Sequence, residues 1–455
     1  MPINSLLYPS NVFVPTTFDV DNSVRMDGSS KFTRSFGSAG NRKKWTMSMW
    51  VKRGALSADQ KLMGKYTSSS DRFALLFNGS DQLQIFWGNS GGNKQITTNR
   101  LFRDTSAFYN FTFIIDTGNS TESDRMQIWV NGVRETSMAS TAYPTSGQDL
   151  PWNDSGVNEI GSYNNSNKFS GYLAEVVHQN DNAATPVDKF ISFDEDTGIC
   201  VPIDVSGLTL GTNGFYLDFE DSSALGNDAS GSNNFTSAGL AATDQGLDTC
   251  TNNFATLNSI VKSAATLSEG NLKQAGAGKS SVATIGVTSG KWYFEQKFIG
   301  SGVNEATLGF ALEGSGIFTN DVGGNTVRGT GYVTLYVYDG KIYNEGTATS
   351  SFATFAVNDI IGWNLDADAG DIFLYRNGSI LNSGNAVVSG KTGKTWFPFG
   401  NFDTGDVTGV EHNFGGARTF SISSAVTDGN GFGAFEFAPK SGHLAICTKN
   451  LAGNS

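Results

Sequence analysis

The residues of this chain that could carry out chemistry are few and scattered. The nearest groups of acids are residues 194–196 and the set Asp366, Asp368 and Asp371. Glycosidases place paired carboxylates at alternate positions of one strand, and neither group has that spacing. The same acids could bind calcium, although both groups lack a downstream bidentate Glu. We interpret them as turn acids and predict no metal and no cofactor.

Other motifs that resemble catalytic sites fail on their context. Gly88 to Gly92 has the letters of a nucleophile elbow, but a strand-like segment follows it where a helix is required. Residues 278–280 and 393–395 resemble the end of a phosphate loop without its first glycine or its helix. The three His and three Cys are far apart, with no CxxC pair. The sequence therefore predicts a protein that is not an enzyme.

Loop aromatics beside amide and carboxylate groups are the best candidates for ligand binding. Trp152 is followed by Asn153 and Asp154, and Tyr163 is followed by Asn164 and Asn165. A flat ring with hydrogen-bonding groups around it is what a sugar needs. The candidate site is therefore Trp152, Asn153, Asp154, Tyr163 and Asn164. The alternative is that Trp152 fills the end of its own sandwich.

The elements that must position these loops are short strands. The chain has 55 Gly, and its runs of Val, Ile, Phe, Tyr and Trp lack the helical repeat, which indicates an all-β protein. Residues 45–53 (WTMSMWVKR) alternate, with Trp50 as the exception. Two hairpins are predicted, at 360–376 and at 110–130, and one short helix from Thr185 to about Phe190.

Two hairpins in a chain of 455 residues indicate two sandwiches of the jelly-roll kind. We predict an extended N-terminal attachment arm at 1–20, a first β-sandwich at 21–221, a connector pinned along a surface at 222–262, and a second β-sandwich at 263–455. Each sandwich is expected to fold alone, and closing strands of the first are expected at 201–210 and 215–219.

The residues of both parts resemble known families. Residues 281–450, with GKWYFEQK, LGFAL and IIGWNLDADAGDIFLYRNG, resemble a SPRY-type domain, which implies a concanavalin-A-like recognition sandwich. Residues 24–220, with WTMSMWVKR and FSGYLAEV, are similar to the laminin-G-like or concanavalin-A-like lectin module. The region from Gly171 to FYLDFED resembles structural proteins of tailed bacteriophages, which implies a virion component of the tail or fibre type.

These resemblances imply an adhesin that recognises a host-surface glycan or a partner protein through loops at the sandwich ends. Its arm is expected to contact other virion proteins, and the chain is expected to form a homo-oligomer. The alternatives are a head-decoration or fibre-anchoring protein without receptor binding and, less favoured, a polysaccharide depolymerase.

The net charge and the hydropathy of the chain restrict the binding partners and the cellular location that we expect. The net charge of −12 opposes nucleic-acid binding, which needs many cations. No signal peptide and no apolar run long enough for membrane insertion is recognised. The expected location is the virion, after synthesis in the host cytoplasm.

Overall fold

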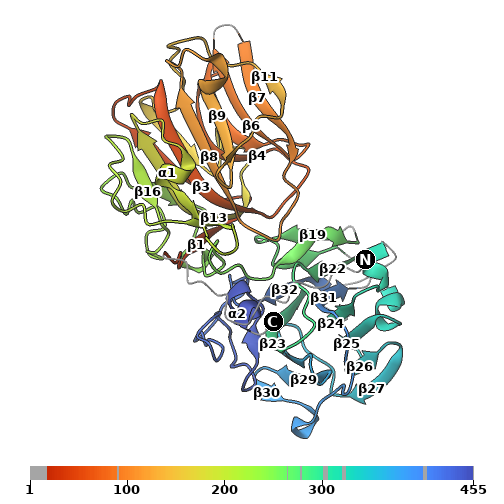
Figure 1. Ribbon diagram of the computed structural model, residues 1–455. Helices are drawn as coiled ribbons and strands as arrows, with labels where there is room; N and C mark the ends of the chain where they lie inside the picture. The colour runs from red at the N-terminus through yellow and green to blue at the C-terminus, as the bar shows by residue number, and fades with distance from the viewer. Residues whose placement is uncertain are drawn as a thin grey trace.

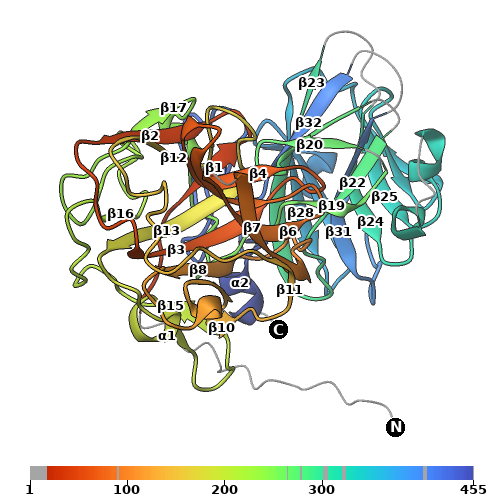
Figure 2. The ribbon, with the colours of Figure 1, turned by 90° about the horizontal axis from the view of Figure 1, so that it is seen from above.

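The computed structural model describes residues 18–89, 92–263, 265–276, 279–300, 306–319, 324–402 and 407–453. Its strands form two β-sandwiches, one above the other in Figure 1 and side by side in Figure 2. The predicted arm at 1–20 lies outside the described residues, apart from its last three.

The first sandwich consists of two antiparallel sheets, which we call sheet I and sheet II. Sheet I has the order β10-β9-β8-β3-β13-β1-β18, with β16 paired to β13, and sheet II has the order β11-β7-β6-β5-β4-β12-β2-β17. The strands of sheet I are β1 (Ser23–Asp27), β3 (Lys44–Arg53), β8 (Tyr109–Asp116), β9 (Met126–Val130), β10 (Val133–Arg134), β13 (Ser170–Asn180), β16 (Phe215–Leu217) and β18 (Gln245–Gly246). Those of sheet II are β2 (Lys31–Phe36), β4 (Gln60–Ser68), β5 (Asp71–Phe77), β6 (Gln82–Asn89), β7 (Gly92–Leu101), β11 (Met138–Thr141), β12 (Gly156–Ile160) and β17 (Thr236–Ala238).

The second sandwich also has two sheets, sheet III and sheet IV. Sheet III contains β19 (Leu257–Lys262), β22 (Lys279–Ala283), β24 (Ala306–Leu312), β25 (Tyr332–Tyr336), β26 (Lys341–Asn344), β27 (Thr347–Ser351) and β31 (Trp396–Phe402). Sheet IV contains β20 (Thr266–Ser268), β21 (Lys273–Ala275), β23 (Lys291–Gly300), β28 (Ile360–Asp366), β29 (Asp371–Arg376), β30 (Ser379–Ile380), β32 (Val407–Asn413) and β33 (Leu444–Ala445). The predicted hairpins are confirmed as β28–β29 and β8–β9.

Helices are minor elements. In the described residues they are α1 (Pro186–Lys189), at the predicted place, and α2 (Thr448–Gly453), besides short 3-10 turns at Glu122–Asp124, Ala242–Asp244, Gly316–Thr319, Gly324–Arg328 and Asn382–Gly384. Within the described part of the chain, no helix has the length and apolar character needed to cross a membrane. The all-β prediction is therefore confirmed.

The alternation of β3 explains how sheet I is buried on both sides. Trp45, Met47, Met49 and Val51 face sheet II in the main core of the first sandwich. Trp50 faces the other way, into a second apolar cluster with Phe190 and other residues of the 184–216 segment. This segment contains α1 and the hairpin of β14 (Ile191–Phe193) and β15 (Cys200–Pro202). The strand expected at 201–210 is wrong beyond Pro202, because the chain leaves β15 to cover sheet I.

The 222–262 segment, expected as a connector along the surface, contributes to both sandwiches. Leu225 and Phe235 are buried in the core of the first sandwich, and β17 and β18 pair with β2 and β1. The segment then enters the second sandwich as β19.

The two sandwiches meet across a seam of polar and apolar contacts. The Tyr172 hydroxyl of sheet I donates to the carbonyl of Gly270 at 2.8 Å. The carbonyl of Gly54 accepts from the Ser259 hydroxyl at 2.7 Å and from Asn271 at 3.0 Å. These contacts place the second sandwich against one end of the outer face of sheet I, and the outer face of sheet II lies on the side away from α1 (Figure 1).

Candidate functional site

Trp152, the first predicted site residue, belongs to the core. Its side chain has 0 % exposure, and its ring lies edge-on to Phe36. Its Nε1 donates to Nε2 of His178 at 3.2 Å. Burial lowers the pKa of His178 to about 4, so the neutral imidazole can accept this bond. A ring without exposed surface cannot stack on a sugar, so the position matches the alternative, in which Trp152 fills the sandwich.

Asn153 and Asp154 are held by neighbouring residues at the same end of the sandwich. Asn153 is fully buried with a positive φ of 67°, and its amide donates to the Asn41 carbonyl at 2.9 Å and accepts from Asn213 at 3.1 Å. Asp154 forms ion pairs with Arg42 at 3.0 Å and Lys65 at 3.7 Å. Both side chains have structural partners, so the structure does not form a ligand site from them and Trp152.

Tyr163 and Asn164 lie elsewhere, on a loop over the outer face of sheet II. Asn164 and Asn165 both have positive φ, and the turn is closed by a bond from the Ser166 amide to the Tyr163 carbonyl at 3.0 Å. The Tyr163 ring packs on Gly64 of β4, where a Cβ would come within 2.8 Å of the ring. Glycine at this position is what lets the ring lie against the sheet.

Tyr66 of β4 completes an aromatic corner with Tyr163. The two ring centroids are 5.6 Å apart with an interplanar angle of 85°, and Tyr66 is 39 % exposed. Burial raises the pKa of the half-buried Tyr163, and the neighbouring Arg72 partly opposes that rise. The corner therefore presents two phenol rings at right angles, one of them open to solvent.

Arg72 of β5 extends this surface toward the next strands. Its guanidinium lies 5.0 Å from the centre of the half-buried Phe86 ring of β6, and it donates to the Asn93 side chain of β7 at 2.6 Å. The strand register places Gly64, Ala74, Phe86 and Gln95 in one row across sheet II. Because Gly64 and Ala74 in this row are small, the aromatic rings and the Arg72 guanidinium protrude from the outer face of sheet II.

Glu159 of β12 is the other neighbour of Gly64 in this row. Its carboxylate accepts from Lys31 of β2 at 2.6 Å and from the Asn165 amide at 3.1 Å. Glu159 and Lys31 also line a hollow of about 450 Å³, with Thr33, Arg34, Ser35, Val157, Asn234 and Thr236. The aromatic corner and the hollow thus meet at Glu159, and we call this surface the sheet II face.

The side chains of the sheet II face are of the types that bind a ligand. It combines exposed ring surface with hydroxyl, amide, carboxylate and guanidinium groups over a hollow of ligand size. Among the described residues no three His, Cys, Asp or Glu side chains are grouped to hold a metal ion.

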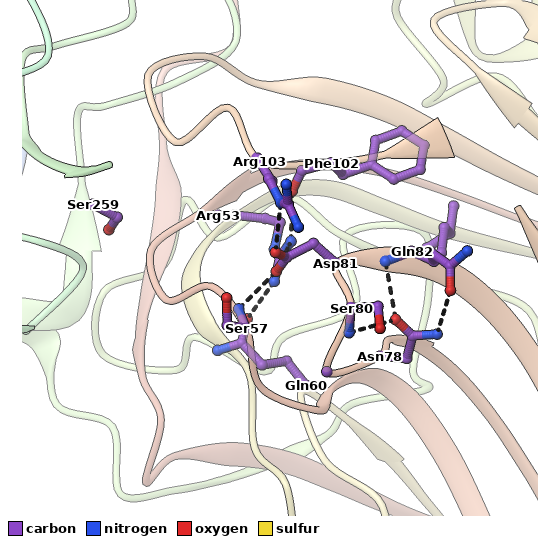
Figure 3. Close-up of polar contacts among 12 residues, drawn as sticks. Arg53, Ser57, Gln60, Asn78, Ser80, Asp81, Gln82, Phe102, Arg103 and Ser259 are labelled. Atoms are coloured by element: carbon purple, nitrogen blue, oxygen red, sulfur yellow. Dashed lines mark hydrogen bonds and ion pairs between the residues drawn. The ribbon is translucent and has the colours of Figure 1, made fainter. Parts of the chain in front are cut away.

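Asp81, which the sequence did not single out, is the centre of a second polar cluster (Figure 3). The carboxylate is 1 % exposed and accepts from Arg53 at 3.1 Å, from the Ser57 amide at 2.7 Å and from Arg103 at 3.1 Å. Burial raises the pKa of Asp81, but the Ser57 amide and the two arginines outweigh it and hold the pKa below its ordinary value. Because both carboxylate oxygens of Asp81 accept hydrogen bonds from these residues, we infer that Asp81 has a structural role and stabilises the 54–59 loop. Gly54 of this loop contacts Ser259 across the seam.

Sequence reasoning missed Tyr66, Arg72, Phe86, Glu159 and Lys31. In β4 the signal was the sequence Gly64-Lys65-Tyr66, because a glycine two positions from an exposed tyrosine marks a gap on the same strand face. The ring that fills this gap comes from the 161–168 loop. Its position could not be predicted from the sequence, because it depends on the pairing of strands that are distant in the sequence.

Comparisons with known proteins agree with the fold of the first sandwich. A family model described as the concanavalin A-like lectin/glucanases superfamily matches residues 27–183, a range that includes β2 to β13. This part of the chain is therefore similar to the concanavalin A-like lectin domains of that family. No curated protein sequence matches the chain.

Solved structures that match part of the chain include the SPRY domain of human HERC1, with 16 % identity and a TM-score of 0.30 over 36 % of this chain and 99 % of that chain. A native heptameric SAP-like pentraxin from Limulus polyphemus has 14 % identity and a TM-score of 0.29, over 41 % and 94 % of the two chains. A putative carbohydrate binding protein from Bacteroides ovatus has 16 % identity and a TM-score of 0.30, over 49 % and 59 %. At such low identities the function has to be inferred from the chain's own residues.

Proposed function

We propose that the first sandwich binds a carbohydrate on the sheet II face. The observation that carries this proposal is the exposed Tyr66–Tyr163 corner beside a polar hollow. In this mode a sugar ring stacks on Tyr66, and its hydroxyls reach Glu159, Lys31 and Arg72. The lectin description of the matching family supports the same class of ligand.

For the whole chain, the proposal extends to an adhesin of a tailed-bacteriophage virion that acts without catalysis. The resemblance of residues 171–221 to phage structural proteins supports it, as does the presence of a second sandwich that resembles a SPRY-type recognition domain. The N-terminal arm would attach the chain to other virion proteins, and copies of the chain would form a homo-oligomer. A head-decoration or fibre-anchoring role is the alternative, and the position of the chain in an intact particle separates the two, since an adhesin belongs at a distal tip.

The direct test is binding of the full chain to an array of glycans, followed by calorimetry on the best ligand. Tyr66→Ala should weaken that binding by about 1–3 kcal/mol, as expected for loss of an aromatic anchor. Tyr338→Ala is the matched control, because Tyr338 is an even more exposed tyrosine on the second sandwich. Thermal unfolding of both variants verifies that they are folded.

Two outcomes would oppose the proposal. Equal losses for Tyr66→Ala and Tyr338→Ala would mean that the sheet II face is not the binding site. Release of reducing sugar ends during the incubation would favour the depolymerase alternative.

A further inference from the structure

Lys52 of β3 is enclosed at the seam between the two sandwiches. Its side chain is 1 % exposed. Its Nζ lies 2.8 Å from Asp248 Oδ2, 2.8 Å from Asn253 Oδ1 and 2.9 Å from the Phe254 carbonyl. A buried lysine in contact with both a carboxyl group and a side-chain amide is an arrangement in which an amine could be acylated.

The surroundings of Lys52 favour its reactive form. The rings of Phe108 and Tyr172 lie 5.9 and 5.5 Å from Nζ, and the Asp248 side chain is 1 % exposed. Burial lowers the pKa of Lys52 and raises the pKa of Asp248, in each case against the attraction of the other group. Both shifts favour an amine and a carboxylic acid over an ammonium and a carboxylate.

We propose that Lys52 and Asn253 become joined by an intramolecular amide bond, with Asp248 as the catalytic acid and base. Starting from the neutral amine and the protonated carboxyl group, the Nζ lone pair attacks Asn253 Cγ and the Nζ–Cγ bond forms. Asp248 gives its proton to Nδ2 and takes one proton from Nζ, the Cγ–Nδ2 bond breaks, and Nδ2 leaves as ammonia. No oxidation or reduction occurs, so the step needs no further reactant.

The position of Asn253 agrees with its role as the acyl donor. Its Oδ1 faces Nζ, while its Nδ2 points away and donates to the Ser106 carbonyl at 2.7 Å. Together these two bonds hold the Asn253 amide beside the amine. Asn253 is half-buried, unlike Lys52 and Asp248, so released ammonia has a short way to solvent.

The bond would connect β3 of sheet I to the segment between β18 and β19. That segment leads directly into the second sandwich. The amide bond would therefore close a covalent loop from Lys52 to Asn253, which contains most of the first sandwich. Its presence does not depend on the proposed carbohydrate site.

The test is mass spectrometry of the denatured full chain. We expect the wild type to be lighter than its sequence by one ammonia. Trypsin should leave Lys52 uncleaved, in a branched peptide that contains Asn253. A chain at full mass with Lys52 in a linear peptide would overturn the proposal, as would ammonia lost within an unbranched peptide, which is the mark of a succinimide. Loss of one water would assign the bond to Asp248 and overturn the role of Asn253.

Two variants make the result specific. Asn253→Ala keeps the Lys52–Asp248 hydrogen bond, so it should fold, as circular dichroism can verify, and should have its full sequence mass. Asn252→Ala is the matched control, because it removes the neighbouring amide, which accepts from the Lys449 backbone and does not contact Lys52. It should retain the loss of ammonia. Retention of that loss in Asn253→Ala would overturn the proposal.

Discussion

The two outer faces of the first sandwich differ in what lies over them. On sheet I, the paired residues Arg25, Tyr172 and Lys52 form a row that is almost completely buried by the seam. On sheet II, the row through Gly64, Glu159 and Ala74 lies beside Tyr66 and Val157, which are 39 % and 50 % exposed. Both sheets contribute equally regular apolar rows to the core between them, so the difference is confined to their outer sides.

The difference shows how a sequence indicates a covered sheet. In β3 the outward positions hold large side chains, Trp50 and Lys52, and each is buried. In β4 and β5 the outward positions include Gly64 and Ala74, which have little surface to bury. A strand with bulky residues on both faces belongs between two layers, whereas small residues alternating with aromatics leave room for a ligand.

The largest expected contrast is between two tyrosines. Tyr172→Ala should cost about 3–5 kcal/mol of unfolding free energy, because the buried ring packs in the core cluster of the second sandwich and its hydroxyl loses the Gly270 bond. Tyr66→Ala, the matched change on the exposed face, should cost less than about 0.5 kcal/mol. Urea unfolding followed by tryptophan fluorescence measures both values.

Similar costs for the two variants would remove the distinction between a covered and an open face. A large cost for Tyr66→Ala would also mean that its ring supports the fold, which would weaken its assignment as a binding residue.

Much of the fold could be predicted from the sequence, and the candidate site only in part. The hairpins β8–β9 and β28–β29 and the helix α1 were predictable because turn residues and alternation are local signals. Trp152 was misplaced as a binding residue because polar neighbours in sequence suggested exposure, whereas Phe36 and His178, which enclose it, come from distant strands. Tyr163 was found because its loop is rich in Asn, and its partner Tyr66 was missed because only sheet pairing brings them together.

An intermediate effect is expected for a carboxyl group on the covered face. Glu175 of β13 has a positive φ of 49° at a register shift of the strand, is 6 % exposed, and accepts from the Tyr216 hydroxyl at 2.6 Å. Burial raises its pKa to about 8, the Tyr216 bond opposes the rise, and Asp218, Glu220 and Asp204 add to it. Glu159 on the open face is instead paired with Lys31.

Because the folded pKa of Glu175 is higher than the unfolded one, its proton stabilises the native state fully below about pH 4.5 and progressively less as the pH rises through about 8. Glu175→Gln has no proton to lose. Relative to the wild type, it should gain on the order of 1–3 kcal/mol of stability between about pH 5 and pH 9. Urea unfolding at both pH values measures the gain, and a constant difference would show that Glu175 is already ionised in the folded protein.

The smallest expected effect concerns Arg72 on the open face. Arg72→Lys keeps the charge but loses the planar contact with Phe86 and the bond to Asn93. Because both contacts lie at a surface open to water, the unfolding free energy should fall by only about 0.5–1 kcal/mol. Affinity for the glycan should fall as well if the guanidinium donates to a sugar hydroxyl, since an ammonium cannot reproduce its two-pronged geometry. Urea unfolding and calorimetry on the same variant separate the two quantities. A stability loss as large as that of Tyr172→Ala would mean that Arg72 holds β5 to its neighbours and that the residues of the sheet II face stabilise the fold. A small stability loss with weakened binding would place Arg72 among the ligand contacts.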